Sequence, residues 1–513
     1  MSGTMHRIAT FYIHGRVRKA LLLSLTVTVL GILIVLHTLP VRAADETGKS
    51  DVDIVLTNTG FKPQTVFITR GTRVTFKTER EDPFWPASDL HPFHTIYSAF
   101  DPKKPLSAEE TWSFVFSRDG RWNYHDHIDP VVMGVIVVVP PGASANKRYD
   151  VLAPCDQASL SGRQGCWKEH IQFALQRNGL AAAFTEVSDI YRSDTEFARN
   201  CHLYVHDLGL LAYQRYGDSM PLISDTRTCG QGFYHGFMEG FLSKHGGDVI
   251  AASTFCRSVE EHHQEDLLLA GPQCYHGIGH GQMEYYLTTR LDLMNDLPRL
   301  VGLGVSDCGK LPNDDTRFRC ASGAYAVVKD WINIQDLTAH YPDLFSLTDP
   351  YALCAYVEKD WEKRACAWEL SKEVLILAKY DAKSAFAAEL AAGRRWAPEY
   401  LPFMVRSTAF LIGEFGVARS DEELVQECSS ISEQEPRTWC IEGIESGLLF
   451  NGSPDNEAPR SARFCASDML NDIEQRTCVD TLLSYMQDAH SQSGLAKACS
   501  ALFTHNLSSP LCR

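Results

Sequence analysis

Residues 124–139 read YHDHIDPVVMGVIVVV, and the run VIVVV at the end of this stretch is rich in β-branched residues, which favours a β-strand. The preceding segments DIVLTN, TVFIT, RVTFKT and TWSFVF are also short and β-rich. Turn-forming segments such as TRGT and SRDGR separate them. About seven strands fit in this part of the chain, a number typical of a small β-sandwich. Residues 51–140 are therefore predicted to form an all-β sandwich.

On the C-terminal side, residues 141–149 lack a periodic apolar pattern and are predicted to be a linker. From residue 150 to residue 513 the apolar residues follow helical spacing, with Ala, Leu and Glu enriched. Steps of 45, 46 and 46 residues separate Cys229, Cys274, Cys320 and Cys366. This period is the size of one helical hairpin, so we expect an all-α helical-repeat domain, either a solenoid or an α/α toroid.

The 16 cysteines all lie between residues 155 and 512. An even count in an exported chain predicts a disulfide framework rather than free buried thiols. Because many cysteines recur 11 to 13 residues apart, we expect neighbours to pair, each bridge joining the end of one helix to the start of the next. The expected close pairs are Cys155 with Cys166, Cys308 with Cys320, Cys354 with Cys366, Cys428 with Cys440, Cys465 with Cys478, and Cys499 with Cys512. The intervals 201–229 and 256–274 are wider.

The N-terminus indicates export. Arg16, Arg18 and Lys19 precede an uncharged stretch, residues 20–40, and small residues suited to a signal peptidase follow. Residues 1–44 are thus predicted to be a signal peptide, or a retained anchor that attaches the protein to a membrane through residues 20–40, since about 20 apolar residues span a bilayer. In either case the remainder is expected outside the cytoplasm, periplasmic or secreted. The net charge of −16 argues against a nucleic-acid partner and suits metal ions.

The segments GFKPQTVFITRGTRVTF, HTIY and YHDHIDPVVMGVIVVV follow the order of the cupredoxins, so the region 51–140 resembles the plastocyanin and azurin family. The resemblance covers under a fifth of the chain and implies a copper site. In that family copper is held by a His before the fourth strand, then by a Cys, a second His and often a Met before the last strand. His94 matches the first His, and Met133 matches the Met.

The family's Cys has no counterpart here. Either His125 or His127 stands in its place, and the second His then falls on Ile128 or Pro130. Another alignment puts Asp126 at the position of the family's Cys and Asp129 at the position of its second His.

Without a thiolate a blue copper site cannot form, so the remaining imidazoles decide the chemistry. Histidine, with Asp89, Asp126 and Asp129 nearby, suits Cu(II) and, less specifically, Zn(II) or Ni(II). If residues 125 and 127 lie on one strand, their side chains point to the same face. The alternative is a sandwich that lost its metal and kept hydrogen-bonded histidines at a loop rim. The predicted metal site consists of His91, His94, His125, His127 and Met133.

A second histidine pattern occurs in the helical region. CGQGFYHGFMEGF, from residue 229, and CYHGIGHGQMEYY, from residue 274, both fit C-x5-H-G-x-M-E, and His202 and His206 upstream also show helical spacing. Side chains four residues apart share one helix face, so these groups predict a second metal site or a general base beside a bound water. The alternative is that the glycines allow close helix approach and the imidazoles bridge polar groups. The candidate residues are His235, Glu239, His276, His280 and Glu284.

Three functions remain open at this level. The first is a non-catalytic, exported copper-binding protein, with zinc as the other candidate metal, whose helical domain docks an unknown protein partner. The second is a metalloenzyme with its centre at the HGxME helices. The third is a metal-free interaction module. The sequence contains no CxxCH, CxxC, GxSxG or phosphate-loop motif that would suggest other chemistry.

Overall fold

The structure is a computed structural model that describes residues 51–142, 155, 160–223, 226, 228–230, 232–262, 270–293, 296–335, 341–450 and 457–512. The predicted signal or anchor, residues 1–44, lies outside the described residues, as does most of the predicted linker. None of the helices in the described ranges combines the length and the apolar composition needed to cross a bilayer.

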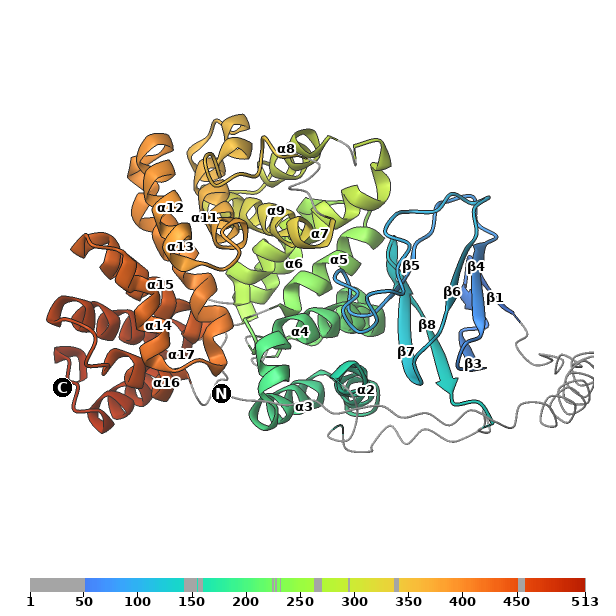
Figure 1. Cartoon of the computed structure of the whole chain (residues 1–513), viewed down its shortest axis with the longest axis horizontal. Helices are drawn as coiled ribbons and strands as arrows, with labels where there is room; N and C mark the ends of the chain where they lie inside the picture. The colour runs from blue at the N-terminus through green and yellow to red at the C-terminus, as the bar shows by residue number, and fades with distance from the viewer. Residues whose placement is uncertain are drawn as a thin grey trace, which may run out of the picture. The chain divides into compact units, whose positions relative to one another are not determined.

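The N-terminal region consists of two four-stranded sheets with the orders β2-β1-β4-β6 and β3-β8-β7-β5 (Figure 1). β1 pairs with β4, and β3 with β8, in parallel, whereas the other neighbours are antiparallel. The strands are β1 Val52–Thr57, β2 Gly60–Lys62, β3 Thr65–Thr69, β4 Arg73–Thr78, β5 Pro86–Ser88, β6 Trp112–Val115, β7 Gly120–Asp126 and β8 Asp129–Val139.

Aromatic side chains form the core between the two sheets. One face of β7 packs into this core, and the opposite face is left for other contacts. Tyr124 of β7 packs against Phe61 of β2 and Phe76 of β4, with ring centroids 4.8 and 5.4 Å apart. Because successive strand residues point to opposite faces, His125 leaves this core and faces the other side of its sheet. The two-residue alternation of the sequence therefore determines the direction of this histidine.

The rest of the described chain is helical (Figure 1). The helices pack in series: α4 packs on the next helix, α5, and from there alternate helices pack together, α5 on α7, α7 on α9, α9 on α11, α11 on α13, α13 on α15, and α15 on α17. The longer helices are α2 Leu160–Asn178, α3 Leu180–Ser193, α4 Thr195–Tyr216, α5 Phe233–Lys244, α6 Val249–His262, α7 Ala270–Thr289, α8 Leu297–Cys308, α9 Asp314–Gln335, α11 Asp360–Leu377, α12 Ala382–Trp396, α13 Leu401–Glu414, α15 Gln434–Phe450, α16 Glu457–Cys465 and α17 Asp472–Thr504. The short helix α14 spans Asp421–Glu427.

Eight disulfides join all the cysteines, and each links neighbours along the chain. The six predicted close pairs are confirmed, and the wider intervals are bridged as Cys201–Cys229 and Cys256–Cys274. Each bridge closes a short loop, which stabilises a fold by about 2–4 kcal/mol. So dense a framework indicates an oxidising, extracytoplasmic compartment.

A buried glutamate in the second half of the helical region allows a pH test of its own. Glu389 of α12 is fully buried, and it accepts hydrogen bonds from the Tyr351 hydroxyl and from Thr408 Oγ1 at 3.2 Å. Burial raises the pKa of this carboxyl to about 7, although the hydrogen bonds oppose the increase. The folded protein therefore binds more protons than the unfolded chain between about pH 4.3 and 7.

We expect the stability that Glu389 contributes to be complete below about pH 4.3 and to be lost as the pH rises toward 7. The stability advantage of the wild type over Glu389→Gln should shrink by roughly 3 kcal/mol across this window. Chemical denaturation of both proteins at a series of pH values measures the difference. Parallel stability curves would contradict the expected burial effect.

Candidate metal centre

The structure brings together four of the five residues predicted for the first site. The four histidines, at positions 91, 94, 125 and 127, are all at most 8 % exposed, and one ring nitrogen from each lies within 4.8 Å of the others. His91 Nδ1 lies 3.2 Å from His125 Nε2, and His94 Nε2 lies 3.0 Å from His127 Nδ1. Two nitrogens on one tetrahedral ion, each at about 2.0–2.1 Å, lie about 3.3 Å apart, so these two distances fit a shared ion as well as a hydrogen bond between the rings.

The four rings come from three different local structures. His91 and His94 lie in the loop after β5, and His125 lies on β7. His127 lies in the two-residue turn between β7 and β8, so the condition that it shares a strand with His125 is not met. A register irregularity between His125 and Asp126 precedes this turn, and the turn brings the ring of His127 back to the cluster. The ring centroids of His91 and His127 are 4.7 Å apart.

Two carboxylates fix the orientation of two of these rings. Asp89 Oδ1 lies 3.0 Å from His125 Nδ1, and Asp101 Oδ2 lies 2.6 Å from His94 Nδ1. Because a carboxylate accepts the proton on Nδ1, the Nε2 atom of each ring presents its lone pair to the other histidines. This is the carboxylate–histidine arrangement that orients metal-binding imidazoles.

The charge state of the rings also suits metal binding. Burial, reinforced by the neighbouring imidazoles, lowers the pKa of His91 and His127 well below the ordinary value. Burial lowers the pKa of His125 to about 4, although the hydrogen bond to Asp89 opposes the decrease. These rings are therefore neutral near pH 7, which is the form that binds a metal ion.

Asp126, Asp129 and Met133, which the sequence also suggested for this site, have other positions and contacts. Asp126 Oδ1 accepts the backbone N–H of Trp85 at 2.8 Å and that of Ile128 at 3.3 Å, so it orders the loop. Asp129 begins β8 and is partly exposed. Met133 lies opposite His125 in the β7–β8 ladder and is half-buried. The alignment that makes Asp126 a ligand therefore finds its carboxylate engaged with backbone.

A lysine from the helical region completes the surroundings of Asp89. Lys168 of α2 contacts Asp89, and its Nζ lies 2.8 Å from Oδ1 of Asp207 in α4. Burial by itself raises the pKa of Asp89, but the Lys168 ammonium and the His125 hydrogen bond outweigh it and hold that pKa below its usual range. Burial lowers the pKa of Lys168, yet the two carboxylates more than compensate and raise it. No sequence pattern indicated this lysine, because it lies 79 residues from Asp89.

The second group of predicted residues also assembles, and it gains members from α4. The rings of His235 in α5 and His280 in α7 stack with centroids 4.2 Å apart, and His276 lies 4.9 Å from His235. His206 of α4 joins His235 and His280 in a group of ring nitrogens within 4.8 Å. The His202/His206 spacing was the signal that could have added His206 to the predicted site.

Glycines beside these histidines let the helices approach closely. A Cβ on Gly236 of α5 would lie 1.9 Å from the carbonyl oxygen of His206, and one on Gly323 of α9 would lie 1.9 Å from that of His276. The Cβ of an alanine at Gly279 of α7 would lie 1.8 Å from the Cys320 carbonyl oxygen. The HG pattern therefore serves tight helix packing and gathers imidazoles at the same time.

We expect Gly236→Ala to destabilise the protein by roughly 3 kcal/mol, because α4 and α5 must separate to admit the methyl group. Gly302 of α8 is the matched control, since a Cβ added there would meet no atom within 4 Å, and its replacement by Ala should stabilise the helix by up to about 1 kcal/mol. Thermal and chemical denaturation of both variants measure the contrast. Equal effects of the two substitutions would refute the close approach.

The two groups of predicted residues, which come from different regions of the sequence, adjoin at His91. Its Nε2 atom lies 3.6 Å from Glu239 Oε2 and 4.0 Å from Glu284 Oε2. Glu239 Oε1 in turn lies 3.0 Å from His206 Nε2. The apolar core is likewise continuous from the sheets into the first helices.

A pocket of about 490 Å³ lies beside the second group. Aromatic side chains from several helices and Phe93 from the loop after β5 form much of its lining, with Lys372 and Glu369, which are ion-paired at 2.8 Å. Its histidines are His202, His206, His235, His276 and His280. The pocket therefore gives a small molecule access to the helical histidines.

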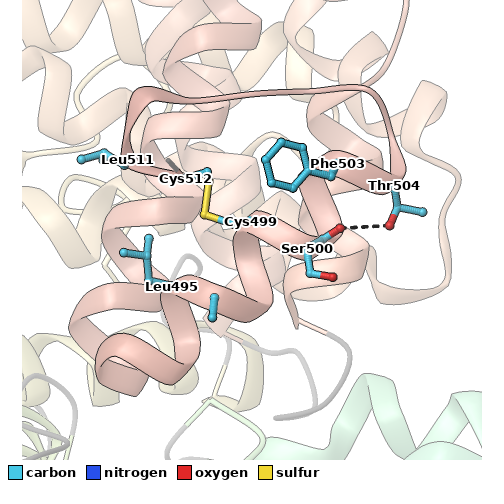
Figure 2. A pocket seen from close by; sticks show the side chains of 8 residues that line it. Leu495, Cys499, Ser500, Phe503, Thr504, Leu511 and Cys512 are labelled. Atoms are coloured by element: carbon cyan, nitrogen blue, oxygen red, sulfur yellow. Dashed lines mark hydrogen bonds between the residues drawn. A yellow bond between two sulfur atoms is a disulfide. The ribbon is translucent and has the colours of Figure 1, made fainter.

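Another hollow lies at the end of α17, where the Cys499–Cys512 disulfide forms one edge (Figure 2). Figure 2 shows Phe503, Leu495 and Leu511 around it and the hydrogen bond from the Thr504 hydroxyl to the Ser500 carbonyl oxygen. Its lining residues include no titratable side chain. This hollow therefore offers no chemistry comparable to that of the histidine groups.

Comparison with known proteins adds little. No family model matches the chain, and no curated protein matches it. Among solved structures, a purple cupredoxin from Nitrosopumilus maritimus is 23 % identical over 17 % of this chain and 100 % of its own, with a TM-score of 0.16. A likeness with this score supports no conclusion about function, which is therefore argued from the geometry of the site.

Proposed function

We propose that this chain is an exported metal-binding protein that holds one copper ion in its four-histidine cluster, with imidazole ligands and no thiolate. The observation that carries the proposal is the convergence of ring nitrogens from four buried histidines within 4.8 Å. In this proposal the two sheets are a cupredoxin-like sandwich, and the helices are a repeat array that docks a protein partner.

The donor set supports copper first and zinc second. Imidazole binds Cu(II) more strongly than it binds the other divalent first-row metal ions, and it is also a common zinc ligand. The carboxylates that contact His94 and His125 hold the rings in place before an ion arrives, which favours binding over rearrangement. Burial of the rings favours retention of the ion rather than fast exchange with solvent.

Titration of the full chain with Cu(II) against a competing chelator tests the proposal. We expect tight binding with nitrogen hyperfine coupling in the EPR spectrum and no intense blue thiolate band. Binding no tighter than that of the unfolded chain with its disulfides intact would overturn it. Metal analysis of protein purified from its own compartment distinguishes copper from zinc.

A second candidate function, a metalloenzyme centred on the HGxME helices, is favoured by the pocket beside the helical histidines. A substrate there would be a small molecule with an apolar, planar part, because aromatic side chains form much of the lining. Ala326→Trp, which fills part of this pocket, should block metal-dependent hydrolysis of a library of small aryl esters. No metal-dependent turnover of any library member by the wild type would remove this candidate.

A further inference from the structure

His91 presents its two ring nitrogens to two different groups of ligands. Nδ1 faces the four-histidine cluster, 3.2 Å from His125 Nε2. Nε2 faces the helices, 3.6 Å from Glu239 Oε2 and 4.0 Å from Glu284 Oε2. One ligand atom from each of His91, Glu239 and Glu284 lies within 4.8 Å of the others. The ring thus belongs to two candidate metal positions.

The helical side of this junction is buried and polar. Glu239 of α5 and Glu284 of α7 are 5 % and 7 % exposed. Within the described residues, neither His91 Nε2 nor either carboxylate oxygen of Glu239 makes a hydrogen bond, although Oε1 lies 3.0 Å from His206 Nε2. Buried polar atoms are rarely left in this state, and buried carboxylates are costly without a compensating positive charge.

We propose that His91 bridges two metal ions, with Nδ1 bound to the ion of the four-histidine cluster and Nε2, Glu239 and Glu284 bound to a second divalent ion. The inference rests on the proposed function for the first ion and adds the second. Carboxylate and imidazole donors suit Zn(II) or a second Cu(II). His206 approaches the same position through its contact with Glu239.

Binding of the second ion requires His91 to lose its remaining ring proton, so one proton is released to solvent as the ion binds. The imidazolate and the two carboxylates then supply negative charge to the two cations. The second ion would hold together the loop after β5, α5 and α7. It would also lie next to His206, which lines the pocket, whereas the four-histidine cluster contributes no residue to the pocket lining.

Metal stoichiometry of the full chain tests this inference. The wild type should bind two equivalents of Cu(II) or Zn(II), and Glu239→Gln and Glu284→Gln should each retain only the first, because an amide is a poor ligand for either ion. Glu389→Gln is the matched control: it replaces another buried helical glutamate, whose contacts are to Tyr351, Ser371 and Thr408, and should retain both equivalents. Circular dichroism and thermal denaturation establish that each variant is folded.

The wild type provides an independent readout. The first equivalent of Cu(II) should give the EPR signal of an isolated ion, and the second should reduce the signal per copper, because exchange through an imidazolate couples the two spins. One equivalent in the wild type, unchanged by Glu239→Gln and with full EPR intensity, would overturn the bridge and leave the proposed function standing. No tight binding in any of these proteins would overturn both.

Discussion

Lys168→Met is expected to lower the free energy of unfolding of the metal-free protein by about 3–5 kcal/mol. The lysine is 2 % exposed and contacts Asp89 and Asp207. Methionine preserves most of the side-chain volume but removes the charge, so two buried carboxylates lose their cation. Chemical denaturation with the disulfides intact measures the loss.

Lys77→Met is the control for this prediction. Lys77 forms an exposed ion pair with Asp53 at 2.6 Å, and such pairs contribute at most about 1 kcal/mol. Similar losses in the two variants would show that the lysine of α2 does not compensate buried charge. Because Asp89 also orients His125, we further expect Lys168→Met to weaken metal binding, which Lys77→Met should leave unchanged.

The second large effect concerns the four-histidine cluster. His127→Ala should lower the affinity of the full chain for Cu(II) by more than about 100-fold. Loss of a residue that only hydrogen-bonds a metal ligand already lowers metal affinity by about 10–100-fold. Asp101→Asn removes a residue that holds a ligand without binding the ion itself, because Asp101 accepts a hydrogen bond from His94 Nδ1 at 2.6 Å. We expect this variant to lose about 10–100-fold in Cu(II) affinity. Chelator competition at constant pH gives both affinities.

His262→Ala is the matched control for the ligand substitution, because His262 lies at the exposed end of α6. It should leave the Cu(II) affinity unchanged. If His127→Ala and His262→Ala have equal affinities, the ring of His127 is not a ligand, and the proposed site is wrong at that position.

The sequence by itself predicted features that depend on neighbouring residues. Cysteine spacing predicted the close disulfide pairs, because a bridge across a short loop requires only that one helix end and the next begin. The two-residue period predicted the β-rich N-terminal region, and the four-residue spacing of His235 and Glu239 predicted their common helix face. Spacing thus indicated the helical histidines, whereas the resemblance to the cupredoxins was what grouped His91 and His94 with His125 and His127.

The tertiary structure alone decided how these groups meet. The position of His127 in a turn, the insertion of Lys168 beside Asp89, and the approach of His91 to Glu239 all depend on how separate elements pack. The physical reason is that periodicity reports which face of its own element a side chain occupies. It does not report which element packs against that face, and here that packing places one histidine between two sets of ligands.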